Sequence, residues 1–140
     1  MAKKLSFLEI LGALLAVCVA PEVCYRMPVT VWIDNSGAVQ IWKKGYSSTC
    51  ELSSAVVRAT ALVASRLRCN LMVKKITRCS NTAAEQADAL SKGEMTRFAG
   101  MWKGPLPEAR GVPRALLKWL ADPQPEAPLG VDLCQEMGLL

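Results

Sequence analysis

The sequence predicts an α/β domain in which a pair of parallel strands is covered by helices. Two short segments, the apolar run at residues 29–33 and residues 71–76, contain β-branched residues and have the length of strands. The segment between them places its apolar residues at helical spacing, and further helical patterns lie on both sides. Strands joined by helices form a parallel crossover, so we expect a parallel strand pair, covering helices and a helical C-terminal extension.

The composition fits one folded domain with a basic surface. The 140 residues are 51% hydrophobic with a mean hydropathy of +0.21, so the apolar side chains need a core. Lys and Arg number 17 against 12 acidic residues, and the net charge of +5 suits a polyanionic partner. Histidine is absent, which excludes Ser-His-Asp catalysis and most zinc sites. The six cysteines form no CxxC pair and are expected to be small buried thiols.

The first helix is expected over residues 5–20, where Pro21 stops it. Its predicted core face consists of Leu8, Leu11, Leu14, Leu15 and Cys18. The same segment resembles a secretory signal peptide, with an early Lys pair, an apolar stretch and Cys-Val-Ala before a proline. We expect an intracellular protein, cytoplasmic or nuclear, which is secreted only if this segment is a cleaved signal. The apolar stretch is too short to span a membrane.

The next elements are a strand and two helices. The apolar residues of the strand, 29–33, are nearly continuous, which predicts that both of its faces are covered. Asp-Asn-Ser-Gly then turns the chain into a short helix over 38–44, which Gly45 ends. A longer helix is expected over 49–67, with Ser48 and Glu51 as a capping box. Its predicted apolar face consists of Leu52, Ala55, Val56, Ala59, Leu62 and Val63.

The second strand, residues 71–76, leads through a loop into another helix. Thr82 and Glu85 form its predicted capping box, and Gly93 lies past its end. Proline-rich segments then flank a short amphipathic helix at 114–122. We therefore expect a partial domain over residues 1–95, and a linker with short helices over residues 96–140.

Three carboxylates stand in apolar or small-residue surroundings, namely Glu9, Asp34 and Asp88. Asp34 ends a strand, and ligand sites in open α/β sheets lie beyond the carboxyl ends of strands. Carboxylates from three elements could meet there, and such oxygen ligands suit Mg²⁺ or Mn²⁺. Each residue also has a plainer interpretation: Asp34 as a turn residue, Asp88 as a solvent-facing helix acid, and Glu9 as a first-turn acid.

Three blocks of the sequence carry a family resemblance: "LSFLEILGALLAV", "VTVWIDNSGAVQIWKKG" and "RCSNTAAEQADALSKG". They resemble, in order, parts of the ribonuclease H-like domains in retrotransposon reverse transcriptases, particularly the DIRS-like, tyrosine-recombinase class. The resemblance covers residues 5–95 and implies an incomplete, N-terminally truncated ribonuclease H-like fold. In that family, four carboxylates around two Mg²⁺ ions hydrolyse the RNA strand of an RNA–DNA hybrid.

The resemblance implies that Glu9, Asp34 and Asp88 are catalytic residues and ligands of Mg²⁺ or Mn²⁺. It also implies a nucleic-acid partner, an RNA–DNA hybrid, with Asn35 and Ser36 on the substrate side. Basic residues near the element ends could follow a phosphate backbone. The residues expected to bind nucleic acid are Asn35, Ser36, Lys43, Lys44, Arg78 and Asn81. Lys74 and Lys75 serve equally well as protection of a strand edge.

The sequence departs from the family pattern at its start. The family's first carboxylate lies on a strand upstream of the helix that would hold Glu9, and no acidic residue precedes Glu9 here. Three strands of the family's sheet have no counterpart. We therefore expect impaired hydrolysis and an unpaired strand edge, which another chain could complete. The alternative is a non-enzymatic remnant that binds nucleic acid or protein.

Overall fold

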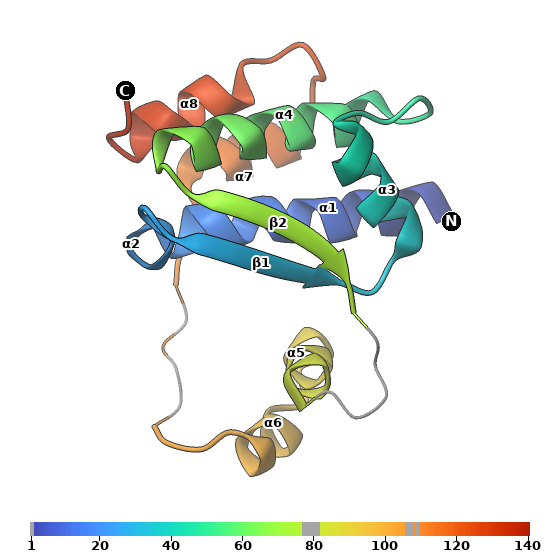
Figure 1. The fold of residues 1–140 in the computed structure, drawn as a ribbon, viewed down its shortest axis with the longest axis vertical. Coiled ribbons are helices and arrows are strands. Elements are labelled where there is room, and N and C mark those ends of the chain that lie inside the picture. The colour runs from blue at the N-terminus through green and yellow to red at the C-terminus, as the bar shows by residue number, and fades with distance from the viewer. Residues whose placement is uncertain (1, 77–81, 106–107, 109) are drawn as a thin grey trace. The chain divides into compact units, whose positions relative to one another are not determined.

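A computed structural model describes residues 2–76, 82–105, 108 and 110–140, with side chains from residue 7 onward except that of Thr82. The elements form two compact units, Met1–Lys75 with Gly111–Leu140, and Ile76–Arg110. In chain order (Figure 1), they are α1 Ala2–Val19, α2 Pro21–Cys24, β1 Pro28–Ile33, α3 Ser36–Lys44, α4 Glu51–Arg66, β2 Asn70–Lys75, α5 Thr82–Ser91, α6 Met95–Met101, α7 Arg114–Ala121 and α8 Leu129–Glu136.

The first unit is built on the parallel strand pair of β1 and β2. The register places Pro28 opposite Asn70 at one end and Ile33 opposite Lys75 at the other. One residue before β1, the Asn70 N–H donates to the Met27 carbonyl at 3.1 Å, so the ladder begins there. The predicted parallel pair with intervening helices is confirmed, and the fold is a mixture of helix and strand.

Helix α3 is held at both ends by residues of the predicted turn motifs. Asn35 is its N-cap, and the Asn35 Oδ1 accepts a hydrogen bond from the Ala38 N–H at 2.9 Å. Gly45 ends the helix at a φ of 84°, in the left-handed region that glycine adopts without strain. Asp34 and Asn35 therefore connect β1 to α3, and the helix begins at Ser36, two residues before the predicted start.

The start of α4 differs from the sequence prediction. The helix begins at Glu51, and its N-cap Cys50 forms no side-chain capping bond, so the predicted capping box is wrong. The preceding serine explains the difference, because the Ser47 Oγ accepts hydrogen bonds from the N–H groups of Thr49 and Cys50. These bonds hold the chain in a turn up to Cys50, and Ser48 lies within that turn.

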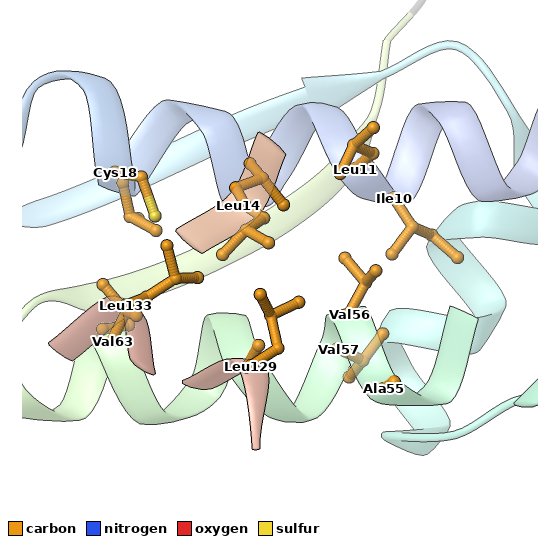
Figure 2. Packing of buried hydrophobic residues seen from close by; sticks show 14 of the residues in the cluster. Ile10, Leu11, Leu14, Cys18, Ala55, Val56, Val57, Val63, Leu129 and Leu133 are labelled. Atoms are coloured by element: carbon orange, nitrogen blue, oxygen red, sulfur yellow. The ribbon is translucent and has the colours of Figure 1, made fainter. Parts of the chain in front are cut away.

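The core of this unit lies between α1, α4 and α8. Buried apolar side chains from the three helices meet there (Figure 2), among them Ile10, Leu14, Cys18, Val56, Val63, Leu129 and Leu133. The predicted face of α1 is correct at Leu11, Leu14 and Cys18 but wrong at Leu8, which is 52% exposed. The predicted face of α4 is confirmed, since its residues are buried or packed against the core.

Only one face of β1 is buried. Val29, Val31 and Ile33 pack on the core formed with the helices of the same unit (Figure 1). Trp32 on the opposite face is 54% exposed, and the Lys74 Nζ lies 5.9 Å from the centre of its ring. The prediction that both faces of this strand are covered is therefore wrong. Burial alternates along the strand, but the apolar run in the sequence does not show this, because the exposed Trp32 is itself apolar.

The C-terminal helices belong to the same core as α1 and α4. Leu116, Trp119 and Leu133 are buried in one cluster with the N-terminal helix. The Glu136 carboxylate of α8 accepts hydrogen bonds from the N–H groups of Arg114 and Ala115, which start α7, at 2.9 and 2.8 Å. This carboxylate caps α7 from a distant part of the sequence and ties the two helices together.

The second unit contains α5 and α6. Ile76, Ala89 and Phe98 are its buried apolar side chains among the described residues, and the Gln86 Nε2 donates to the Met101 carbonyl at 3.0 Å. Gly93 lies past the end of α5 as predicted, with a φ of 71°. The domain boundary expected at residue 95 lies inside this unit. The predicted capping box that begins this helix involves the Thr82 side chain, which lies outside the described residues.

Candidate functional site

Asp34 stands at the carboxyl end of β1, where the strand turns into α3. Its carboxylate forms an ion pair with Lys75, the last residue of β2, at 3.6 Å between Oδ1 and Nζ. The Asp34 side chain is 33% exposed, so both burial and charge pairing are partial. The parallel register explains the pair, because it brings the ends of both strands to the same place. Sequence reasoning considered Lys75 for phosphate contact or edge protection, but not as the partner of Asp34.

Asn35 and Ser36 follow at the start of α3. The Asn35 side-chain oxygen is engaged as the N-cap of the helix, which explains this residue without a ligand. Ser36 is the first helical residue and is exposed. Of the predicted substrate-side pair, Ser36 therefore offers an exposed hydroxyl, while Asn35 has a structural function.

Lys43 and Lys44 form the last turn of α3 and are exposed. Lys43 lines a depression of about 260 Å³ beside β2, together with Trp42, Leu71, Met72 and Val73. The indole of Trp42 packs partly against the core. Lys44 lines a separate cavity of about 270 Å³ on the other side of the helix end. The two neighbouring lysines thus line two different depressions of the surface.

The cavity beside Lys44 is rich in hydroxyl groups. Its lining consists of Gly37, Gln40, Ile41, Lys44, Tyr46, Ser47, Ser48, Thr49, Cys50 and Ser53, and contains no carboxylate. The buried Ser53 Oγ has no hydrogen-bond partner among the described residues. A cation surrounded by hydroxyl donors, without an acid, favours an anionic ligand such as a phosphate group.

The loop that forms this cavity is held by α4. The Ser47 N–H donates to the Ser54 Oγ at 2.8 Å, and that hydroxyl donates to the Ser47 carbonyl at 3.2 Å. Sequence reasoning missed the loop, although the hydroxyl-rich run from Tyr46 to Thr49 after a glycine helix end was a visible signal. These bonds hold the backbone of the loop at Ser47 against α4.

Glu9 lies on α1, between the exposed Leu8 and the buried Ile10, and its side chain is half-buried. It belongs to the same compact unit as Asp34. The strongly apolar setting expected for this carboxylate is thus only partly realised.

Asp88 lies on α5 in the second unit and is held by two cations. Its Oδ2 is 3.2 Å from the Lys92 Nζ and 3.2 Å from the Arg97 Nη1 of α6. Arg97 also contacts Glu94 at 3.3 Å, and hydrogen bonds to Asp88 and then Glu94 raise the pKa of its guanidinium. These ion pairs join α5 to α6, which gives Asp88 a structural function within this unit.

Four of the described thiols are buried and unsuited to nucleophilic chemistry, while the fifth, Cys50, is only partly buried, unlike the prediction for small core thiols. Cys18, Cys24, Cys69 and Cys134 are buried and not in disulfides, as predicted for small core residues. Burial raises the pKa of the Cys18 thiol to about 12 and also raises the pKa of the other three. A thiol with a raised pKa is protonated at neutral pH and is a poor nucleophile.

The predicted metal site depends on residues in both compact units, Glu9 and Asp34 in one and Asp88 in the other. Within the described part of the chain, no group of three or more Cys, Asp or Glu side chains could hold a metal ion. Arg78 and Asn81, predicted to contact nucleic acid, lie outside the described residues. The described helices also include none that is long and apolar enough to cross a membrane.

Comparison with known proteins gives no relative. No protein-family model, no curated protein and no solved structure matches this chain.

Proposed function

We propose that this chain is a ribonuclease H-like domain of retroelement origin that binds nucleic acid and is impaired in hydrolysis. The observation that carries the proposal is the position of Asp34 at the carboxyl end of one strand of a parallel pair. The order of elements agrees with the resemblance, since helix α1 with Glu9 precedes that strand and helix α5 with Asp88 follows the second strand. These residues match three of the family's four carboxylates, so we expect weak hydrolysis at most.

The cavity beside Lys44 supports contact with a nucleic-acid backbone. Its single cation and its hydroxyl groups can bind one phosphate, and the absence of a lining carboxylate removes repulsion of that anion. Lys43 and Ser36, both exposed on the same helix, can add further contacts along a strand. The partner that fits the resemblance is an RNA–DNA hybrid.

The cofactor in this proposal is Mg²⁺ or Mn²⁺, with Asp34, Glu9 and Asp88 as its ligands. Such an ion, when bound, activates water and stabilises the leaving oxygen of a phosphodiester. At Asp34 the Lys75 ammonium group already neutralises the carboxylate, so an arriving cation has to replace it. At Asp88 the cation has to compete with Lys92 and Arg97. We therefore expect weak metal binding.

Calorimetric titration with Mn²⁺ tests the metal part of the proposal. Asp34→Asn should abolish binding while leaving the fold intact, because the lost ion pair is partly exposed and contributes about 0–1 kcal/mol. Asp88→Asn should weaken binding if the second unit contributes a ligand. Asp132→Asn on the exposed surface of α8 is the matched control and should leave binding unchanged. Equal binding by Asp34→Asn and the wild type would refute the metal site.

Binding and cleavage of a labelled RNA–DNA hybrid test the remainder. Lys44→Gln should weaken hybrid binding and reduce its salt dependence, because one phosphate contact is lost. Lys118→Gln, an exposed lysine on α7, is the control. Unchanged binding by Lys44→Gln would contradict the assignment of the cavity. Cleavage that depends on Asp34 would show a working nuclease, and binding without cleavage a degenerate one.

The second candidate function is a non-enzymatic interaction protein built on the same scaffold. It is favoured by the outer edge of β1, which has no strand neighbour among the described residues. This second function predicts that the protein associates with another protein chain in the absence of nucleic acid. It also predicts that the protein binds neither Mn²⁺ nor an RNA–DNA hybrid.

A further inference from the structure

The outer edge of β1 offers free backbone hydrogen-bonding groups. The Met27 carbonyl points to β2, where it accepts the Asn70 N–H. Peptide groups alternate in direction along a strand, so Val29 and Val31 also face β2. The N–H and C=O groups of Thr30 and Trp32 therefore point away from β2, and in the described structure no strand accepts them.

This edge lacks the features that normally keep strand edges apart. The six residues of β1 carry no charge, and its only proline is the first residue. The other edge of the pair is different, because β2 carries Lys74 and Lys75 and packs against α3. Natural proteins protect exposed edges with charged residues, prolines or covering helices. Within the described part of the first unit, the covered edge of β2 thus contrasts with the uncharged edge of β1, which is suited to a strand partner.

We propose that this partner is β1 of a second copy of the chain, paired antiparallel across a twofold axis at Val31. In this register Thr30 lies opposite Trp32 of the other copy, and each pair exchanges two N–H···O=C bonds. All outward-pointing groups of Thr30 and Trp32 are then satisfied. The two neighbouring registers are worse. An axis at Thr30 would pair Trp32 with Pro28, which has no N–H to donate. An axis at Trp32 would pair Thr30 with Asp34, which lies beyond the end of the strand.

A twofold axis perpendicular to the sheet keeps the two faces distinct. Val29, Val31 and Ile33 of both copies stay on the helix-covered face, and Trp32 stacks beside Thr30 of the other copy on the exposed face. The result is a four-stranded sheet in the order β2-β1-β1-β2. Two-stranded sheets are marginal in water, so the added strands stabilise both copies.

The charge distribution favours a second copy as the occupant. The protein carries a net charge of +5, which opposes self-association through any basic surface. The β1 edge is uncharged and can meet its own copy without repulsion. Lys74 of one copy would lie about three strand spacings, roughly 14 Å, from its counterpart. That separation exceeds the Debye length of about 8–10 Å at physiological salt.

This inference rests on the second candidate function, which it makes specific, and it does not require a metal or nucleic acid. Sedimentation velocity over a range of concentrations should show a dimer. Thr30→Pro should be a monomer at every concentration, because the lost N–H points outward while the bonds to β2 remain. Thr30→Val keeps the N–H and should remain a dimer. Circular dichroism shows whether both variants are folded.

Amide hydrogen exchange on the wild-type protein gives a test without substitution. Protection of the Thr30 and Trp32 N–H groups should rise with protein concentration, while Val29 and Val31 stay protected throughout by β2. A wild type that is monomeric at all concentrations, with rapid exchange at Thr30 and Trp32, would overturn the inference. So would a Thr30→Pro dimer or a larger oligomer. Thr30→Pro should bind Mn²⁺ as the wild type does, so failure of either proposal leaves the other testable.

Discussion

At the scale of single residues, Asp34 and its neighbour Asn35 have separate functions. The turn after β1 needs a residue that caps α3, and the Asn35 side chain provides that cap. An N-cap of this type contributes about 1 kcal/mol to stability. Asp34 makes no part of this cap and instead contacts Lys75. The turn motif therefore explains Asn35, and the ion pair with Lys75 gives Asp34 a partner of its own, so that its assignment as a metal ligand stays a prediction.

The buried Cys18 thiol predicts how stability depends on pH. Its pKa is raised from 9.0 to about 12 by burial, so the folded protein favours the protonated thiol. This contribution is complete below pH 9 and is lost as pH rises toward 12, since the unfolded chain then releases its proton first. Between pH 8 and pH 10, the contribution of Cys18 to the free energy of unfolding should fall by about 1 kcal/mol. Urea unfolding at pH 8 and pH 10 measures this.

Cys18→Ala is the control for that experiment. The variant should be less stable at pH 8, because a buried side chain is shortened, but its stability should fall less between the two pH values. The remaining fall comes from Cys24, Cys69 and Cys134, whose pKa values are also raised. An identical fall in the wild type and the variant would show that Cys18 does not titrate as proposed.

At the scale of elements, the contact between α4 and α8 depends on one glycine. A Cβ atom at Gly130 would lie 3.1 Å from the Ala59 Cα and 3.1 Å from the Leu62 Cδ2. The Ala59 backbone cannot move without shifting α4, so a larger side chain forces the helices apart. Gly130→Val should lower the free energy of unfolding by about 1–3 kcal/mol. Thermal and urea unfolding both measure this change.

Gly12 provides a matched substitution in another helix. A Cβ atom there would meet no atom within 4 Å, and the residue is exposed on α1. Gly12→Val should therefore leave stability unchanged or raise it slightly, because valine has a better helix propensity than glycine. Equal destabilisation by the two substitutions would indicate a general effect of valine in a helix instead of a close approach between α4 and α8.

The elements that could be predicted from the sequence are those whose side chains follow a regular spacing along one segment. The parallel strands and the apolar face of α4 come from side-chain spacing within one segment, and the structure confirms both. The exposure of Trp32 could not be predicted, because its apolar character hides which face of the strand it occupies. The start of α4 could not be predicted either. Ser48 has the capping-box spacing to Glu51, but it is the Ser47 hydroxyl that accepts the hydrogen bond from Cys50 and fixes the turn. The pairing of Asp34 with Lys75 depends on strand register, which the sequence does not specify.

At the scale of the whole molecule, segments that are far apart in the sequence pack into one compact unit. The segment Gly111–Leu140 packs into the same compact unit as Met1–Lys75, while the residues between them form a second unit. Proline-rich segments around α7 suggested a peripheral extension, yet Trp119 and Leu133 are buried in the common core. Contacts between segments far apart in sequence have no local pattern. The three-carboxylate site stays a prediction for the same reason, since it requires Asp88 to act with residues of the other unit.

This arrangement predicts that a chain ending at residue 95 cannot fold. Such a chain keeps every block that resembles the ribonuclease H-like family, but it loses Leu116, Trp119, Leu129, Leu133 and Cys134 from the core. The exposed faces of α1 and α4 should then cause unfolding or aggregation, because large buried side chains each contribute about 1.5–3 kcal/mol. Circular dichroism and size-exclusion chromatography distinguish these outcomes from a folded monomer.

The complementary chain removes the second unit and keeps the C-terminal helices. Residues 77–109 are replaced by a Gly/Ser linker of about 20 residues, which behaves as a flexible coil and imposes no structure on the ends that it joins. This chain should unfold cooperatively near the temperature of the intact protein, because the cluster that joins α1, α4, α7 and α8 is complete. A folded 1–95 chain together with an unfolded linker chain would reverse the assignment, and would place the stabilising contacts of the core in the residues that precede the C-terminal helices.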